Sequence, residues 1–144
     1  MKRRAFTSFG LSLLLLLAFV IFFQQSFNSI IVSGTSMLPT FQSGQRVWSS
    51  RAYWLVGKIH KGDIVVLKDP VAAGGYIIKR VAFMPGDTVD FYNVPRNWKL
   101  TQGPFKVPEG SIYVLGDNRP VSEDSRAFGP VELDRVLGKV VIRS

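Results

Sequence analysis

The sequence predicts a mainly β protein, a compact coiled sheet or barrel-like domain that follows one N-terminal transmembrane helix. Two observations carry this prediction: an uncharged apolar run over residues 6–23, and a change after it to short apolar segments bounded by turn formers. After that run, no long segment repeats its apolar residues with the 3.6-residue period of an amphipathic helix. With 144 residues, the chain is long enough for one domain and an appendage, which we place at residues 29–144 and 1–28.

Residues 1–28 are predicted to form a basic cytoplasmic tip and a transmembrane anchor. The run 6–23 spans about 27 Å as a helix, close to the thickness of a bilayer's hydrocarbon core. Lys2, Arg3 and Arg4 precede it without an acidic neighbour. By the positive-inside rule, the N-terminus stays in the cytoplasm and the following domain lies on the outer face. A cleaved secretory signal has a similar outline, but we see no small-x-small cleavage site after the run and favour an uncleaved anchor.

Residues 29–144 are predicted to be a β domain on the far side of the membrane. Its candidate strands are rich in β-branched or aromatic residues and lie between turn formers such as Lys61-Gly62-Asp63. The expected strands are residues 30–33, 45–50, 63–68, 76–83, 87–92, 111–115 and 136–143.

Residues 48–58 (WSSRAYWLVGK) form a distinct aromatic stretch within this domain. Aromatic rings favour the headgroup region of a bilayer, where a ring is half wet and half apolar. Ordinary core packing explains the same composition equally well. The sequence leaves both interpretations open.

The composition argues for a membrane surface and against several classes of chemistry. Of the net charge of +8, three positive charges belong to the N-terminal tip, and the rest of the chain has 15 basic and 10 acidic residues. That remaining part has no Lys/Arg-rich run and no nucleic-acid motif, so we expect a lipid bilayer and no nucleic acid as partner. Because cysteine is absent and His60 is the single histidine, thiol catalysis is excluded, and we expect no metal site and no cofactor.

Ser36 is the first candidate for chemistry, in a turn-forming segment close behind the apolar run. Gly34 permits a backbone shape that exposes the following hydroxyl, and Pro39 restricts the exit of the turn. Serine at its free pKa is a poor nucleophile and needs a base beside it. Without one, Ser36 is an ordinary turn residue.

Two side chains are candidates for that base. In residues 76–83 (YIIKRVAF), Lys79 shares a strand face with Ile77, Val81 and Phe83 and interrupts an otherwise apolar set. Burial would lower the pKa of Lys79, and a neutral amine beside a serine hydroxyl is a general base. A lysine at a sheet edge that reaches water along its stem fits the pattern about as well. His60 is the other candidate, but two flanking lysines favour a solvated surface position.

A polar loop after the strand 111–115 is the third candidate. It contains Gly116-Asp117-Asn118-Arg119 and then Ser122-Glu123-Asp124-Ser125-Arg126. Such residues are common in simple Asx turns. The alternation of arginines, acids and hydroxyls also suits an ion-paired scaffold that holds a second hydroxyl against a lysine amine.

Taken in order, these segments resemble the type I signal peptidases, the membrane-bound Ser–Lys proteases that remove signal peptides, in a minimal form with a single anchor. The resemblance covers nearly the whole chain, and four ordered motifs make it specific. The motifs are Ser36-Met37-Leu38-Pro39-Thr40, Lys61-Gly62-Asp63-Ile64-Val65, Tyr76-Ile77-Ile78-Lys79-Arg80-Val81 with Met84-Pro85-Gly86-Asp87, and Gly116-Asp117-Asn118-Arg119 through Ser122, Asp124-Ser125-Arg126 and Gly129-Pro130-Val131.

The resemblance implies a role for each matching residue. Ser36 is the expected nucleophile, Lys79 its general base, and Ser122 the hydroxyl that orients the lysine amine. The Ser36 backbone N–H would donate to the oxyanion, and the Gly34 backbone belongs to the same loop, where some relatives have a serine. The expected structural ion pairs involve Arg80, Asp117, Asp124 and Arg126.

The implied activity is cleavage of signal peptides from exported preproteins after small residues in an Ala-x-Ala-like pattern, through a Ser36 acyl-enzyme. We therefore expect a single-pass protein of a bacterial plasma membrane that acts on preprotein signal peptides, with the secretion machinery as a further partner. Two alternatives stay open: a specialised processing peptidase of the conjugative or organellar type, and an inactive β module that binds extended peptides.

Overall fold

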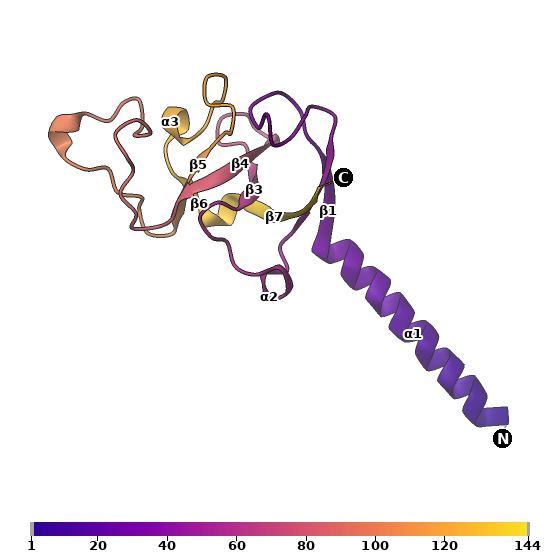
Figure 1. The fold of residues 1–144 in the computed structure, drawn as a ribbon. Helices are drawn as coiled ribbons and strands as arrows, with labels where there is room; N and C mark the ends of the chain where they lie inside the picture. Colours follow the sequence, from indigo (N-terminus) through magenta and orange to yellow (C-terminus); the bar gives the residue numbers. More distant parts are fainter. Residues whose placement is uncertain (1, 144) are drawn as a thin grey trace.

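A computed structural model describes residues 2–143 and consists of one long helix followed by a β domain (Figure 1). Helix α1 (Lys2–Ser26) projects away from the domain, and residues Phe9–Ser26 have a mean hydropathy of 2.0, with none of these residues buried inside the protein. This helix is long and apolar enough to cross a membrane. The predicted run 6–23 therefore lies inside a helix that extends further at both ends.

The domain is a single antiparallel sheet that curls into a half-barrel, which confirms the mainly β, coiled-sheet prediction. The strand order is β1-β2-β7-β3-β4-β5-β6, so β1 and β6 are its edges. The short helices α2 (Tyr53–Val56) and α3 (Ser125–Phe128) and the 3-10 turns η1 (Leu100–Gln102) and η2 (Leu133–Arg135) lie in its connections. The strands are β1 (Phe27–Ile31), β2 (Arg46–Ser50), β3 (Ile64–Lys68), β4 (Tyr76–Phe83), β5 (Ser111–Leu115), β6 (Val131–Glu132) and β7 (Val136–Arg143).

The predicted strand 87–92 is wrong. Only an isolated bridge joins Thr88 to Lys106, inside a long connection between β4 and β5. The carboxylate of Asp90 accepts the backbone N–H of Tyr92, and the Asp90 carbonyl accepts that of Asn93, so the chain turns as soon as it has left the bridge. This local hydrogen bonding competes with strand pairing and wins here. The two-residue strand β6 was not predicted, because it is too short for an alternating pattern.

The two faces of β4 contribute to different apolar clusters. Ile78 packs in a cluster with Met37 and Phe41, which anchors the turn that carries Ser36. Val81 packs in a second cluster with Ile112 and Val114 of β5. A third cluster lies under the long connection, around Val89, Val107 and Tyr113. Ala82 and Phe83 of β4 pack against this third cluster as well. Because β4 contributes to all three clusters and pairs with β3 from Tyr76 to Arg80, its side chains have well-defined positions.

Candidate active site

Ser36 and Lys79, which lie 43 residues apart in the chain, meet in the structure. The Lys79 Nζ donates a hydrogen bond to Ser36 Oγ at 2.8 Å. Lys79 lies on β4 opposite Val65 of β3, and Ser36 lies in the turn between β1 and β2. Gly34, two residues before Ser36, has a φ of 85°, in the left-handed region that favours glycine. The two residue types needed for a nucleophile and its base are thus within hydrogen-bond distance.

Lys79 is 4% exposed, which is unusual for a lysine. Burial lowers the pKa of its amine, while the negative charges of Asp124, Asp69 and Glu123 act in the opposite direction. Burial has the larger effect, so the pKa lies below its ordinary value. This shift favours the neutral amine, which is the form that accepts a proton from a serine hydroxyl.

The turn that carries Ser36 is held from both ends. The side chains of Met37 and Phe41 are buried in the first apolar cluster. From the loop after β5, the Asn118 backbone N–H donates to the Ser36 carbonyl at 2.9 Å, and the Asn118 side-chain amide donates to the Thr35 carbonyl at 3.1 Å. These contacts connect the Ser36 backbone to the loop that follows β5.

Arg80 and Asp117 form a two-point ion pair beside the Ser36 turn. The guanidinium of Arg80 donates to the two carboxylate oxygens of Asp117 at 2.8 and 2.7 Å, and it also donates to the Gly62 carbonyl. Asp117 accepts a further hydrogen bond from the Thr40 hydroxyl. Burial alone would raise the pKa of Asp117, but the hydrogen bonds from Arg80 and Thr40 and the charge of Arg80 hold it below its usual value.

Asp124 and Arg126 form a second two-point pair at the start of α3. The Arg126 guanidinium donates to both carboxylate oxygens at 2.9 Å, and the Gly116 backbone N–H donates to one of them at 3.0 Å. The side chain of Asp124 is fully buried. Burial acts to raise its pKa, and the hydrogen bonds from Arg126 and Gly116 outweigh that effect and lower it. The pair connects the end of β5 to α3.

Ser122 lies in the centre of this loop and is 3% exposed. Its hydroxyl has no hydrogen-bond partner of ordinary geometry among the described residues, although its proximity to Asp124 contributes to the lowered pKa of that carboxyl. A side chain at Gly116 would collide with Ser122 and would place its Cβ 2.7 Å from the Ser36 carbonyl oxygen. The missing side chain of Gly116 is therefore what lets the Ser36 turn and the Ser122 loop pack together.

His60, the other candidate base, lies at the surface. Its side chain is 72% exposed, and its Nδ1 is 3.9 Å from the carboxylate of Asp63, which pairs more closely with Lys139. The Ser36 hydroxyl thus has the Lys79 amine, and not this imidazole, as its hydrogen-bonding partner.

Two cavities meet at Ser36 and Lys79. The smaller one has a volume of about 80 Å³ and lies between residues 31–33 and the first half of β4, with Met37 as part of its wall. The larger one has a volume of about 380 Å³ and extends under the loop after β3 and past Glu123. Both open directly on the Ser36–Lys79 pair.

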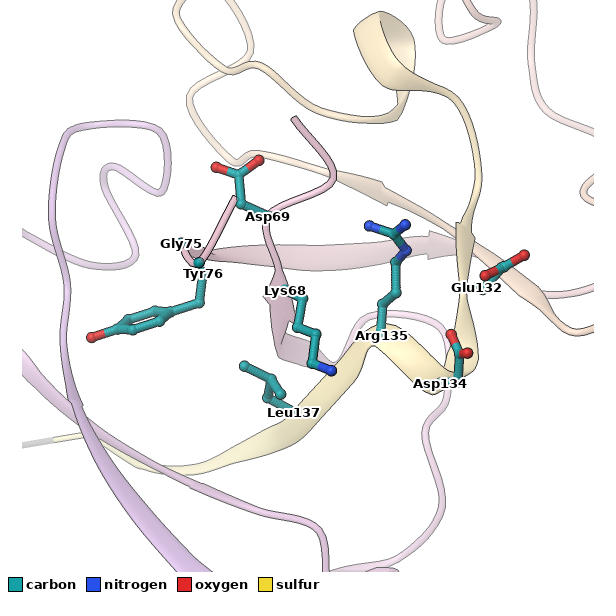
Figure 2. Close-up of a pocket in the computed structure, with 9 residues that line it drawn as sticks. Lys68, Asp69, Gly75, Tyr76, Glu132, Asp134, Arg135 and Leu137 are labelled. Carbon is teal, nitrogen blue, oxygen red and sulfur yellow. The ribbon is translucent and has the colours of Figure 1, made fainter. Parts of the chain in front are cut away.

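A third cavity, of about 570 Å³, adjoins the other two, since Tyr76 and Asp69 belong to its wall as well (Figure 2). Its wall carries charges of both signs. The cations are Lys68 and Arg135, and the acids are Asp69, Glu132 and Asp134. Neither Ser36 nor Lys79 lines it. The largest of these three cavities is therefore not one that Ser36 and Lys79 line.

The roles of Asn118, Thr40 and Gly116 were not predicted from the sequence. All three belong to motifs that were recognised, but nothing in a single sequence shows that Asn118 reaches the Ser36 turn or that Thr40 donates to Asp117. A polar residue and a glycine in a loop are more often parts of a turn. Only the approach of two segments about 80 residues apart gives them a function.

Known proteins resemble the chain over most of its length. A family model described as "Signal peptidase, peptidase S26" matches residues 3–95 and 92–144. A signal peptidase I of Bacillus licheniformis is 34% identical, with 78% of this chain and 73% of the relative covered. A signal peptidase IB of Staphylococcus aureus (strain COL) is 32% identical, with 78% and 74% covered. A crystal structure of a signal peptidase I from Enterococcus faecalis V583 is 32% identical, covers 58% of this chain and 97% of that chain, and has a TM-score of 0.43.

Proposed function

The chain belongs to the signal peptidase family, peptidase S26, and on this premise we propose that it is a membrane-anchored serine endopeptidase that cleaves signal peptides from exported preproteins. The observation that carries the proposal is the 2.8 Å hydrogen bond between Lys79 Nζ and Ser36 Oγ in a buried position. It supports an acyl-enzyme mechanism with Ser36 as nucleophile and Lys79 as general base.

In the proposed reaction, the neutral Lys79 amine accepts the hydroxyl proton of Ser36 while Oγ attacks the scissile carbonyl carbon. The tetrahedral intermediate collapses, the C–N bond breaks, and the leaving amine takes the proton from Lys79. A water molecule then attacks the Ser36 ester, with Lys79 again accepting a proton. Breakdown of the second intermediate returns that proton to Oγ and releases the signal peptide with a free carboxylate.

The oxyanion of both intermediates needs donors, and we propose the Ser36 backbone N–H as one of them. The left-handed conformation at Gly34 shapes the loop around this group. Since glycine has no side chain, residue 34 contributes a backbone shape and no hydroxyl donor.

The preference for small residues follows in this proposal from the cavity of about 80 Å³. It has room for a small side chain such as that of alanine. β4 pairs with β3 from Tyr76 onward but with β5 only from Arg80 onward, so residues 76–79 have an open edge on the β5 side among the described strands. An extended peptide can add to that edge as a strand and place its side chains alternately in the wall and in solvent.

Ser122 is proposed to orient the Lys79 amine. It lies in the loop that packs against the Ser36 carbonyl, and its buried hydroxyl has no ordinary hydrogen-bond partner. A buried hydroxyl without a partner is costly, so a hydrogen bond with the amine once Lys79 is neutral would remove that cost. Asp117, Arg80, Asp124 and Arg126 then act as the ion-paired frame of the site.

The proposed location is a bacterial plasma membrane, with the basic tip of α1 in the cytoplasm and the β domain on the outer face. The support for it is the apolar helix α1 together with Lys2, Arg3 and Arg4 at its start. This orientation places Ser36 on the side where signal peptides emerge and where the secretion machinery could deliver them.

The test is cleavage of a preprotein by the full chain reconstituted in liposomes. Ser36→Ala and Lys79→Ala should each lower the cleavage rate at least about a thousandfold, since nucleophile and base act as a unit. His60→Ala is the matched control and should keep the wild-type rate. A serine-directed acylating inhibitor should label Ser36 in the wild type and nothing in Ser36→Ala.

Circular dichroism of the purified variants checks that the sheet is intact. Full activity in Ser36→Ala or Lys79→Ala would refute the mechanism. Loss of activity in His60→Ala with survival in Lys79→Ala would instead support a serine–histidine mechanism.

A further inference from the structure

We propose that the cavity of about 380 Å³ receives the first residues after the cleaved bond, and that Asp69 and Glu123 on its wall make it prefer a cationic side chain there. The inference rests on the proposed peptidase function and adds a substrate class to it: preproteins whose mature part begins with a lysine or arginine at the first or second position.

The two cavities at Ser36 divide the substrate. Residues before the scissile bond belong in the smaller cavity, because it lies along the open edge of β4, where an extended peptide can pair. A peptide that continues past Ser36 then enters the larger cavity. This cavity is lined by Gly34 and Thr35 on one side and by the loops of Asp69 and Glu123 on the other. The larger cavity is therefore the one that receives the residues after the scissile bond, and we call it the exit cavity.

The charged groups that line this cavity are Lys79, Asp69 and Glu123. Lys79 is engaged with Ser36 and acts as a neutral base in the proposed reaction. The carboxylates of Asp69 and Glu123 then give the exit cavity a negative potential, although the chain as a whole has a net charge of +8. The exposed side chains of Val71 and Val121 provide apolar surface on the same wall, against which the stem of a lysine or arginine can pack.

Neither carboxylate is neutralised by an ion pair among the described residues, since the pairs there involve Asp63, Asp117 and Asp124. One oxygen of Asp69 accepts the backbone N–H groups of Val71 and Ala72 at 2.8 and 3.0 Å, and these bonds lower the pKa of Asp69. The carboxylate is therefore ionised at neutral pH.

Figure 2 shows the position of Asp69 relative to the neighbouring cations. Its carboxylate points away from the side chain of Lys68. Asp69 lines the cavity of Figure 2 as well as the exit cavity, and thus lies on the wall between them. Neither Lys68 nor Arg135, the cations of the neighbouring cavity, lines the exit cavity.

Because the two carboxylates lie on a solvated cavity wall, we expect them to change the cleavage rate only modestly. Exposed ion pairs contribute about 0.2–1 kcal/mol, so each carboxylate should change the rate about 1.4- to 5-fold. The effect should weaken as salt screens the charges, because the Debye length falls from about 10 Å at 0.1 M to about 3 Å at 1 M.

The experiment measures kcat/KM of the full chain in liposomes on three peptides that are identical except for Lys, Gln or Glu at the first position after the bond. At low salt, the Lys peptide should be cleaved about two- to fivefold faster than the Gln peptide, and the Glu peptide slower by a similar factor. Glu123→Gln should reduce this spread, and so should Asp69→Asn, which keeps the side-chain oxygen that accepts the two N–H groups. Glu132→Gln is the matched control, because this exposed acid lies outside the exit cavity, and it should leave the spread unchanged.

A second measurement distinguishes an effect of the residues after the scissile bond from an effect of the residues before it. All three peptides form the same acyl-enzyme, because the acyl group holds only the residues before the bond. Single-turnover kinetics should therefore show different acylation rates and one common deacylation rate.

Equal kcat/KM for the three peptides at low salt would overturn the inference while leaving the peptidase proposal intact. A spread that survives unchanged in both Glu123→Gln and Asp69→Asn would also overturn it. Failure to cleave any of the peptides, together with preproteins, would instead refute the proposed function.

Discussion

At the scale of single residues, the amine of Lys79 is the group on which the proposed chemistry depends. Its burial lowers the pKa, and the carboxylates of Asp124, Asp69 and Glu123 partly oppose that effect. A lysine on an apolar strand face was predicted from the alternation in residues 76–83. The opposing charges were not predicted, because they come from loops far away in the chain.

The pH dependence of cleavage follows from this balance. Only the neutral amine is a base, so kcat/KM should be low in acid and rise with pH, with its inflection below the ordinary lysine value of 10.5. Asp69→Asn removes a negative charge that raises the pKa of Lys79, so the inflection should move to lower pH. Rates measured from pH 6 to 11 check both statements, and an inflection unmoved by Asp69→Asn would contradict the second.

At the scale of elements, the two arginine–carboxylate pairs connect β4, β5 and α3 around the site. Arg80 on β4 meets Asp117 just after β5, and Asp124 at the start of α3 meets Arg126 and the Gly116 backbone. Both carboxyl pKa values are lowered in the folded protein. Each carboxylate therefore contributes stability that is present above its unfolded pKa and is lost as the pH falls through its folded pKa.

Replacing these carboxylates should destabilise the fold to different extents. Asp124→Asn leaves Arg126 without its charged partner at a fully buried carboxyl position, and we expect a loss of about 3 kcal/mol. The Asp117 side chain is 15% exposed, so Asp117→Asn should cost less, about 1–2 kcal/mol. Urea unfolding at pH 7 measures the free energy of unfolding of both variants. The difference between wild type and each variant should shrink towards pH 2, where the wild-type carboxylates become protonated. A larger loss for Asp117→Asn would contradict this ranking.

At the scale of the whole molecule, α1 and α2 approach each other on one side of the sheet (Figure 1). The ring of Trp54 on α2 lies 5.8 Å from that of Phe22, which is inside the apolar window Phe9–Ser26 of α1. Trp54 is 76% exposed and Leu55 53% exposed. Because these side chains lie beside the apolar part of the anchor, we expect α2 to lie at the headgroup level of the membrane, with its aromatic ring at the interface.

The absence of cysteine allows a direct test of this orientation. A single cysteine at Trp54, labelled with an environment-sensitive fluorophore, should show a blue-shifted emission in liposomes and quenching by lipids brominated near the headgroup. The matched control is a cysteine at Tyr92, which is 87% exposed but lies on the long connection between β4 and β5. It should report an aqueous environment, and equal quenching at both positions would contradict the proposed orientation.

The sequence alone predicted what depends on local patterns: the apolar run, the alternating strands, and Ser36 and Lys79 as nucleophile and base candidates. Hydropathy and alternation are patterns of neighbouring residues, so they can be recognised without knowledge of the fold. The tertiary structure decided what depends on distant segments. The sheet register brings Lys79 to Ser36, the loop after β5 brings Asn118 and Gly116 against the Ser36 turn, and Asp69 and Glu123 reach the same cavity from two loops. Such contacts depend on which strands pair and in which register, and neither is encoded in the spacing of any one motif.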